Sequence, residues 1–260
     1  RSLGSIEKNN NIVLQTVKNV GYVTLVLTLA CILWQVIAIT SDKPYLPKLE
    51  SIAAKLYLEL VYGRLLEDLV ATIRRILLSI LIALIAGVSS GLLSARISLG
   101  YRILRPIILA TYPIPHVTLI PILLWILGIE YSKIGVISLI AFYPIAISTM
   151  EWSLRSPKEY EDIVETMGGG MYHKLRYVII PSIIPGVLTG LRIATSTAYA
   201  VAFIAESFVL TNGVGAYIEE SWHRLDYAGV YSGVVLLSVM GIVTYMLIWL
   251  IEKMYRRKIE

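Results

Sequence analysis

Cysteine and histidine are scarce in this sequence. Its 260 residues include one cysteine, Cys31, and three histidines. A lone cysteine excludes an intrachain disulfide and a metal site built from several thiolates. The histidines (His116, His173 and His223) lie far apart in the sequence, which argues against a histidine-based metal site.

Motifs typical of soluble enzymes are also missing. The sequence contains neither a Walker A phosphate-binding pattern nor a zinc-binding H-E-x-x-H pattern. The segment 87–91 matches G-x-S-x-G as a string, but it lies in an apolar run, where the strand–turn–helix context of a nucleophile elbow does not fit. We interpret its small residues as a helix-packing surface. The chain is therefore predicted to have no catalytic or metal site and to bind no cofactor itself.

Charged residues make up only 16% of the chain, and hydrophobic residues 57%. Soluble domains average about 25% charged and about 45–50% apolar residues. The hydrophobic residues are concentrated in runs, each with a length close to the roughly 20 residues needed to cross a bilayer. The sequence therefore predicts an all-α membrane protein of the cell (inner or cytoplasmic) membrane, with six transmembrane helices in the lipid bilayer. The expected spans are about 19–40, 73–95, 106–128, 133–150, 183–209 and 228–251.

The polar segments define three regions: a leader (1–18), one transmembrane domain (19–252) and a basic tail (253–260). With both termini in the cytoplasm, most basic residues outside the spans fall on the inner side, as membrane proteins prefer. This orientation also places the loop 151–182 in the cytoplasm. The net charge of +5 is thus attributed to membrane topology, and no nucleic-acid partner is expected. The helical apolar spacing of 49–60 predicts either an amphipathic helix on the outer membrane surface or a plain connecting helix.

The third expected span contains Pro113, Pro115 and Pro121, with His116 beside them. Each proline removes a backbone donor and kinks a helix. Such breaks survive at membrane depth where protein or a water-filled cavity satisfies the freed carbonyls. Pro113, Pro115 and His116 are therefore candidates for a translocation pathway. His116 is either a proton relay or ligand, or a histidine hydrogen-bonded to a neighbouring carbonyl.

Glu206, near the outer end of the fifth expected span, is the clearest charge inside a span. A buried acid in a membrane is a functional candidate, so Glu206 joins the pathway candidates. Pairing with an arginine or a backbone donor is an equal alternative. A single acid makes a poor proton relay, which favours an external energy source over ion coupling.

The polar loop 151–182 separates two hydrophobic regions. A short helix is expected at 160–167, followed by Gly168, Gly169 and Gly170, a second amphipathic run, and Pro181. A membrane protein rarely keeps so structured a loop unless a partner docks on it.

This loop resembles the cytoplasmic loop of the membrane subunits of bacterial and archaeal ABC importers. The family pattern is E-A-A, three residues, Gly, nine residues, then I-x-L-P. Here 162–164 (Asp-Ile-Val) takes the E-A-A position, Gly168 is the glycine, and 178–181 (Val-Ile-Ile-Pro) takes the last position. The departures keep acidity and apolar character but add bulk at 163 and 164. Further segments resemble the nitrate/sulfonate/taurine branch of these permeases: 112–115, 121–133, 183–192, 205–206 and 213–215.

The resemblance implies a type I ABC importer-like permease that carries a small polar solute such as nitrate, a sulfonate or taurine. A vitamin or vitamin precursor is the alternative solute, and an ion-coupled secondary transporter is the alternative function. The implied partners are ABC ATPase subunits that hold ATP and Mg, a second copy of this permease, and an external solute-binding protein. Residues about 160–172 would form a coupling helix on the ATPase. The implied docking residues are Asp162, Glu165, Gly168, Gly169, Tyr172 and Pro181.

Overall fold

The computed structural model describes the backbone of residues 3–209 and 211–259, and the side chains of residues 21, 22, 24–209 and 211–255. Within these ranges the chain is helical and has no strand, which confirms the all-α prediction. The α-helices are α1 (Leu3–Ser41), α2 (Leu49–Val61), α3 (Leu65–Arg96), α4 (Arg105–Thr111), α5 (Ile120–Leu154), α6 (Lys158–Thr166), α7 (Met171–Lys174), α8 (Ile180–Phe208), α9 (Val214–His223) and α10 (Tyr227–Ile259). Two π-helical turns, Gly100–Leu104 and Leu175–Ile179, and a 3-10 turn, His116–Leu119, connect some of them.

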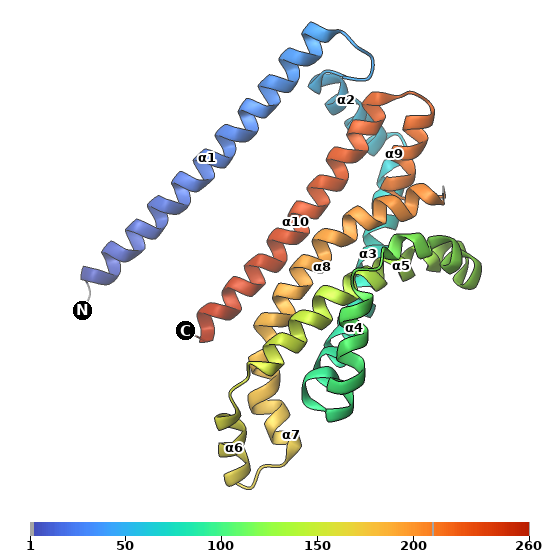
Figure 1. Ribbon diagram of the computed structural model, residues 1–260. Helices are drawn as coiled ribbons and strands as arrows, with labels where there is room; N and C mark the ends of the chain where they lie inside the picture. Colours follow the sequence, from blue (N-terminus) through green and yellow to red (C-terminus); the bar gives the residue numbers. More distant parts are fainter. Residues whose placement is uncertain (1–2, 210, 260) are drawn as a thin grey trace.

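The long helices α3, α5, α8 and α10 form a bundle with short helices at both ends (Figure 1). Helices α2 and α9 lie at one end, here named the α9 end. Helices α6 and α7 lie at the opposite end, named the α6 end, and α1 begins and α10 finishes toward that end (Figure 1). Helix α5 packs mainly on α3 and α8, whereas α1 makes few contacts outside α2.

Among the residues that the structure describes, five helical stretches are long and apolar enough to cross a membrane: Thr24–Ser41, Leu65–Arg96, His116–Leu154, Met171–Phe208 and Tyr227–Tyr255. The six expected spans are therefore an approximate count. The difference lies in residues 106–150, where two spans were expected. Helix α4 ends at Thr111, and α5 then consists of two helical stretches that meet in a kink at Gly128, next to the gap placed between those spans.

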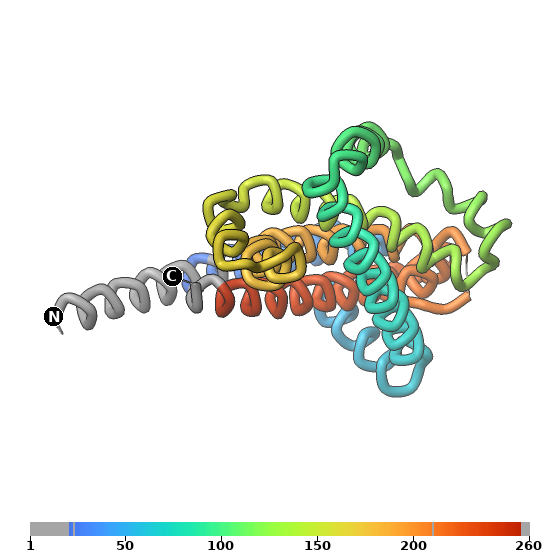
Figure 2. Tube along the Cα trace, turned by 90° about the horizontal axis from the view of Figure 1, so that it is seen from below, coloured from blue at the N-terminus to red at the C-terminus, as the bar shows by residue number. Residues whose placement is uncertain are grey.

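Two local features explain this difference. The sequence Tyr-Pro-Ile-Pro at 112–115 interrupts the expected third span, because proline fixes φ and removes a donor. Within α5, Gly128 has φ +77° and ψ −179°, so the helix changes direction there. Seen from below, the part of the chain that leads into α5 lies at the margin of the fold (Figure 2).

The remaining expectations concern the ends of the chain and the loop between the first spans. Helix α2 corresponds to the helix predicted at 49–60. Helix α1 runs through residues 3–18, for which a separate leader was predicted, and α10 continues into the predicted tail. The side chains of residues 1–20 lie outside the described part, so the character of that leader stays a prediction.

Glycines on α3 and α8 bring helices of this chain close together. A Cβ added at Gly91 would lie 2.6 Å from the carbonyl oxygen of Ala146, and one at Gly190 would lie 2.7 Å from that of Pro144. Both contacts are on α5, so α3 and α8 approach its two sides through glycine. The core of the bundle lies between these helices, with Ile76, Val136, Ile137, Ala198, Ala202 and Ala205 buried. The apolar outer surfaces of α1 and α10 remain exposed, as hydrocarbon contact permits.

Candidate functional site

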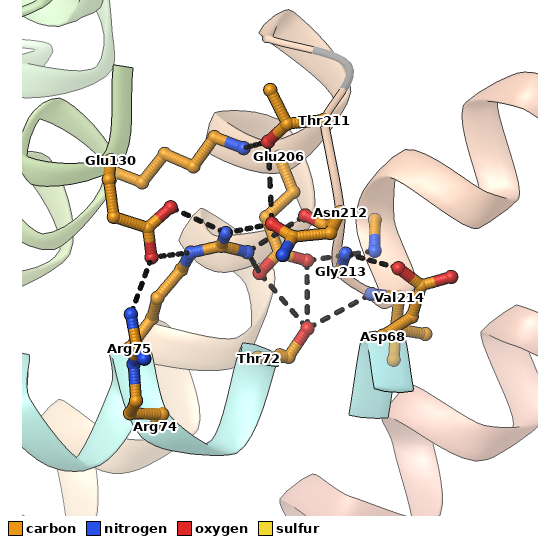
Figure 3. A network of polar contacts seen from close by, with 12 residues as sticks. Asp68, Thr72, Arg74, Arg75, Glu130, Glu206, Thr211, Asn212, Gly213 and Val214 are labelled. Carbon is orange, nitrogen blue, oxygen red and sulfur yellow. Dashed lines mark hydrogen bonds and ion pairs between the residues drawn. The ribbon is translucent and has the colours of Figure 1, made fainter. Parts of the chain in front are cut away.

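A network of charged side chains lies inside the bundle, in the half that carries α9 (Figure 3). Its centre is Arg75 of α3, which has no exposed surface. Arg75 Nη1 donates to Glu206 Oε1 over 2.8 Å. Its Nε and Nη2 donate to the two oxygens of Glu130 over 3.0 and 2.7 Å. The same guanidinium also reaches the carbonyl and side-chain oxygens of Asn212. One arginine therefore links α3, α5, α8 and the segment before α9.

Glu206 is fully buried and accepts hydrogen bonds from two further groups. Thr72 Oγ1 lies 2.9 Å from Oε2, and the backbone N–H of Gly215 donates to the same oxygen over 2.9 Å. Gly215 lies in the first turn of α9, where unpaired N–H groups and the helix dipole favour a negative charge. The carboxylate thus has both a counter-charge and a full set of donors.

The network continues at both sides. Asp68 accepts from the N–H of Gly213 over 2.7 Å and lies 3.3 Å from Arg64 Nε. On the other side, the buried Lys133 donates to Thr211 Oγ1 over 2.6 Å. These contacts tie the segment between α8 and α9 to α3 and α5. Acidic and basic side chains therefore lie next to one another throughout this cluster.

The structure places Glu206 in the arrangement that the sequence left as an alternative, beside an arginine and a backbone donor. The expectation that it lines a pathway is untested and stays a prediction. Sequence reasoning missed Arg75, which lies within the second expected span, 73–95. An arginine in a long apolar run is costly unless it is paired, and that cost was the available signal.

His116 is also buried, and its Nε2 lies 2.9 Å from the hydroxyl of Tyr143. Tyr143 in turn donates to Thr111 Oγ1 over 3.1 Å. The hydrogen-bond partner of His116 is therefore a hydroxyl on α5. The sequence analysis had considered a neighbouring carbonyl as a partner. Pro113 and Pro115 are exposed at the break between α4 and α5, and neither residue belongs to the charged network.

At the α6 end, the three glycines terminate α6. Gly168 has φ +82°, its N–H donates to the carbonyl of Glu165, and the N–H of Gly169 donates to that of Val164. This pair of bonds is a Schellman motif with glycine at the left-handed position. Residues 160–172 are therefore a helix, a glycine turn and a second short helix. Helix α6, which ends at Thr166, corresponds to the short helix expected at 160–167, and the role of residues about 160–172 as a coupling helix stays a prediction.

Two ion pairs hold this loop in place. Arg96, at the end of α3, contacts Glu161 of α6 over 2.5 Å and donates to the side chain of Ser153 over 2.8 Å. Lys174 of α7 contacts Glu165 of α6 over 2.5 Å, and this hydrogen bond holds the pKa of Glu165 below its ordinary value. Of the other predicted docking residues, Asp162 and Tyr172 lie on this loop, whereas Pro181 stands in the first turn of α8.

A family model described as "Binding-protein-dependent transport system inner membrane component" matches residues 76–257. The chain belongs to this family. It is a multi-pass membrane permease component of an ABC importer for a small solute. This membership decides against the ion-coupled secondary transporter.

Similar proteins carry several different solutes. The chain is 31% identical to the riboflavin transport system permease protein RibX of Chloroflexus aurantiacus, over 90% of this chain and 88% of that protein. It is 27% identical to the formylaminopyrimidine transport permease protein ThiX of Halalkalibacterium halodurans, over 85% and 89%. It is 27% identical to the taurine transport system permease protein TauC of Escherichia coli, over 67% and 64%.

A solved structure shares the fold. A chain of the MetNI methionine ABC transporter, in an inward-facing conformation, superposes with a TM-score of 0.65 at 19% identity. The match covers 74% of this chain and 95% of that chain. The fold is therefore that of a type I ABC importer permease, as the resemblance implied.

Proposed function

We propose that this permease forms the translocation pathway of an ATP-driven importer and that the α6–α7 loop docks on a separate ATPase subunit. The observation that supports docking is an apolar surface on this loop. Its exposed side chains are Tyr160, Ile163, Met167, Met171 and Tyr172. Water-exposed apolar side chains of this number on one short loop are typical of a protein interaction site.

The anchoring of the loop supports a mechanical role. Arg96 joins α6 to the ends of α3 and α5, and the chain continues from α7 through a π-helical turn directly into α8. Movement of a docked α6 would thus be passed to three long helices. ATP binding and hydrolysis on the partner would bias two states of the permease, which is the minimum that alternating access requires.

The orientation follows from the same proposal. The α6 end would face the cytoplasm, together with both termini, and the α9 end would face the outside. An external binding protein would deliver the solute at the α9 end, and a second copy of the permease would complete the pathway. ATP and Mg would be held by the ATPase, because this chain has no phosphate-binding motif.

A small sulfonate such as taurine, or nitrate, is the first solute class that we propose. It is based on the permease branch that segments 112–115, 121–133, 183–192, 205–206 and 213–215 resemble. A vitamin or vitamin precursor is the second class. It is favoured by the greater length over which the riboflavin and formylaminopyrimidine permeases match this chain. The external binding protein would supply most of the selection between them.

Docking is tested with one substitution at each end of the molecule. Met167 is 82% exposed at the end of α6, and Tyr62 is 78% exposed between α2 and α3 at the α9 end. We expect Met167→Glu to abolish co-purification with the ATPase subunit at an unchanged thermal unfolding midpoint, and Tyr62→Glu to preserve it. Retention of the ATPase by the Met167→Glu variant would contradict the proposal. A ligand-panel thermal shift on the binding protein would then assign the solute class.

A further inference from the structure

The two carboxylates on Arg75 differ in how they are held. The Glu206 side chain has no exposed surface, whereas the Glu130 side chain is 34% exposed. Glu206 also accepts from Thr72 and from the N–H of Gly215. In the described part of the chain, the hydrogen-bond partners of the Glu130 side chain are two arginines, Arg74 and Arg75. Breaking the contacts of Glu130 and moving its carboxylate into water therefore costs far less free energy than the same change at Glu206.

The positive charge of Arg75 would still have a counter-charge if the Glu130 side chain moved away. Its Nη1 keeps Glu206 at 2.8 Å and the carbonyl of Asn212 at 2.8 Å. A buried arginine without a counter-charge is strongly destabilising, but here one buried carboxylate stays in place. The cluster thus allows one of its two ion pairs to open while the other keeps the charge balanced.

The backbone beside Glu130 permits such a motion. Gly128 has φ +77°, and a Cβ added there would meet no atom within 4 Å. The helix direction changes at this residue, two positions before Glu130. The segment before it is little packed, with Trp125 88% exposed and Ile126 62% exposed. The pair of Glu130 with Arg75 holds the first turn after Gly128 against α3, and the next contact of this kind is the hydrogen bond from Ser79 Oγ to the carbonyl of Ile134.

We propose that Glu130 is a releasable latch at the α9 end: when its pair with Arg75 breaks, the turn of α5 that follows Gly128 opens from α3, while the pair between Arg75 and Glu206 stays closed. In the transporter this opening would admit solute from the α9 end. That use rests on the proposed function, but the opening itself is a property of this chain alone.

Thiol labelling can detect the opening in the full-length chain. Ser132 is fully buried in the turn that follows Gly128, and Ser94 is fully buried at the other end of α3. In a Cys31→Ser background, which removes the natural cysteine, Ser132→Cys reports the latch and Ser94→Cys reports general loosening. The chain is placed in lipid nanodiscs, where both membrane faces meet a water-soluble maleimide. Labelling of a buried thiol proceeds at a rate set by the population of its open state.

We expect Glu130→Gln to raise the labelling rate of Ser132→Cys about two- to fivefold, the range that loss of a partly exposed ion pair gives. The rate at Ser94→Cys stays unchanged. The matched control is Glu67→Gln. It removes an exposed acid two helical turns before Arg75 on α3 and is expected to change neither labelling rate.

An unchanged rate at Ser132→Cys in the Glu130→Gln variant, or an equal rise at both probes, would overturn the latch. This test uses no ATPase, so its result is separate from that of the docking experiment. Retention of the ATPase by the Met167→Glu variant, together with an intact latch effect, would remove the proposed function only. Loss of the ATPase in that variant, together with no latch effect, would remove the latch only.

Discussion

The guanidinium of Arg75 and the carboxylate of Glu206 lie 2.8 Å apart, 131 residues apart in sequence, and neither side chain has any exposed surface. This pair joins α3 to α8 inside an apolar bundle. Taking two charges out of water is costly, and the surrounding donors from Thr72 and α9 are what offset that cost. The pair is therefore expected to be needed for a defined structure at the α9 end.

Replacement of Glu206 by glutamine tests this role. We expect Glu206→Gln to lower the free energy of unfolding by about 2–4 kcal/mol, because Arg75 loses its buried counter-charge and the amide presents a donor to a site built of donors. A fall in the thermal unfolding midpoint in detergent measures this. Glu67→Gln, at an exposed position of α3, should leave the midpoint unchanged. A Glu206→Gln variant with wild-type stability but impaired transport would assign Glu206 to the pathway.

The glycines after α6 give a matched comparison. Gly168 has φ +82° and Gly170 has φ −82°, and a Cβ at either position would meet no atom within 4 Å. Gly168→Ala should cost about 1–2 kcal/mol through backbone conformation, whereas Gly170→Ala should cost little. Gly168→Asn should recover part of the loss, since asparagine tolerates the left-handed region. Equal effects of the two alanine variants on loop protection from amide hydrogen exchange would contradict the assigned motif.

Arg96 connects α6 to the bundle through several N–H donors of its planar guanidinium group. It contacts Glu161 over 2.5 Å and the side chain of Ser153 over 2.8 Å. Arg96→Lys keeps the charge but loses this planar group, so we expect amide protection across α6 to fall about tenfold, as loss of a charge-assisted bond allows. Arg155→Lys is the control, since Arg155 is 72% exposed and lies 3.9 Å from its partner. Unchanged protection of α6 in the Arg96→Lys variant would show that other contacts hold it.

Local patterns in the sequence predicted several parts of the fold correctly. The long apolar runs predicted membrane helices because a bilayer requires them to be continuous, and the spacing at 49–60 predicted α2. The spacing between Gly168 and Pro181 pointed to the family. The span count is only approximate at 106–150, because a proline-rich break and a left-handed glycine produce shapes that hydropathy does not register.

The sequence by itself determined the membrane class, the family and the position of the structured loop, because hydrophobic length, glycine and proline placement act through neighbouring residues. Only the tertiary structure decided which groups face each other. It paired Glu206 with Arg75 and Glu130 with the same guanidinium, and it turned glycines on α3 and α8 toward α5. These relationships join residues far apart along the chain. They depend on how helices pack, and no local pattern contains that information.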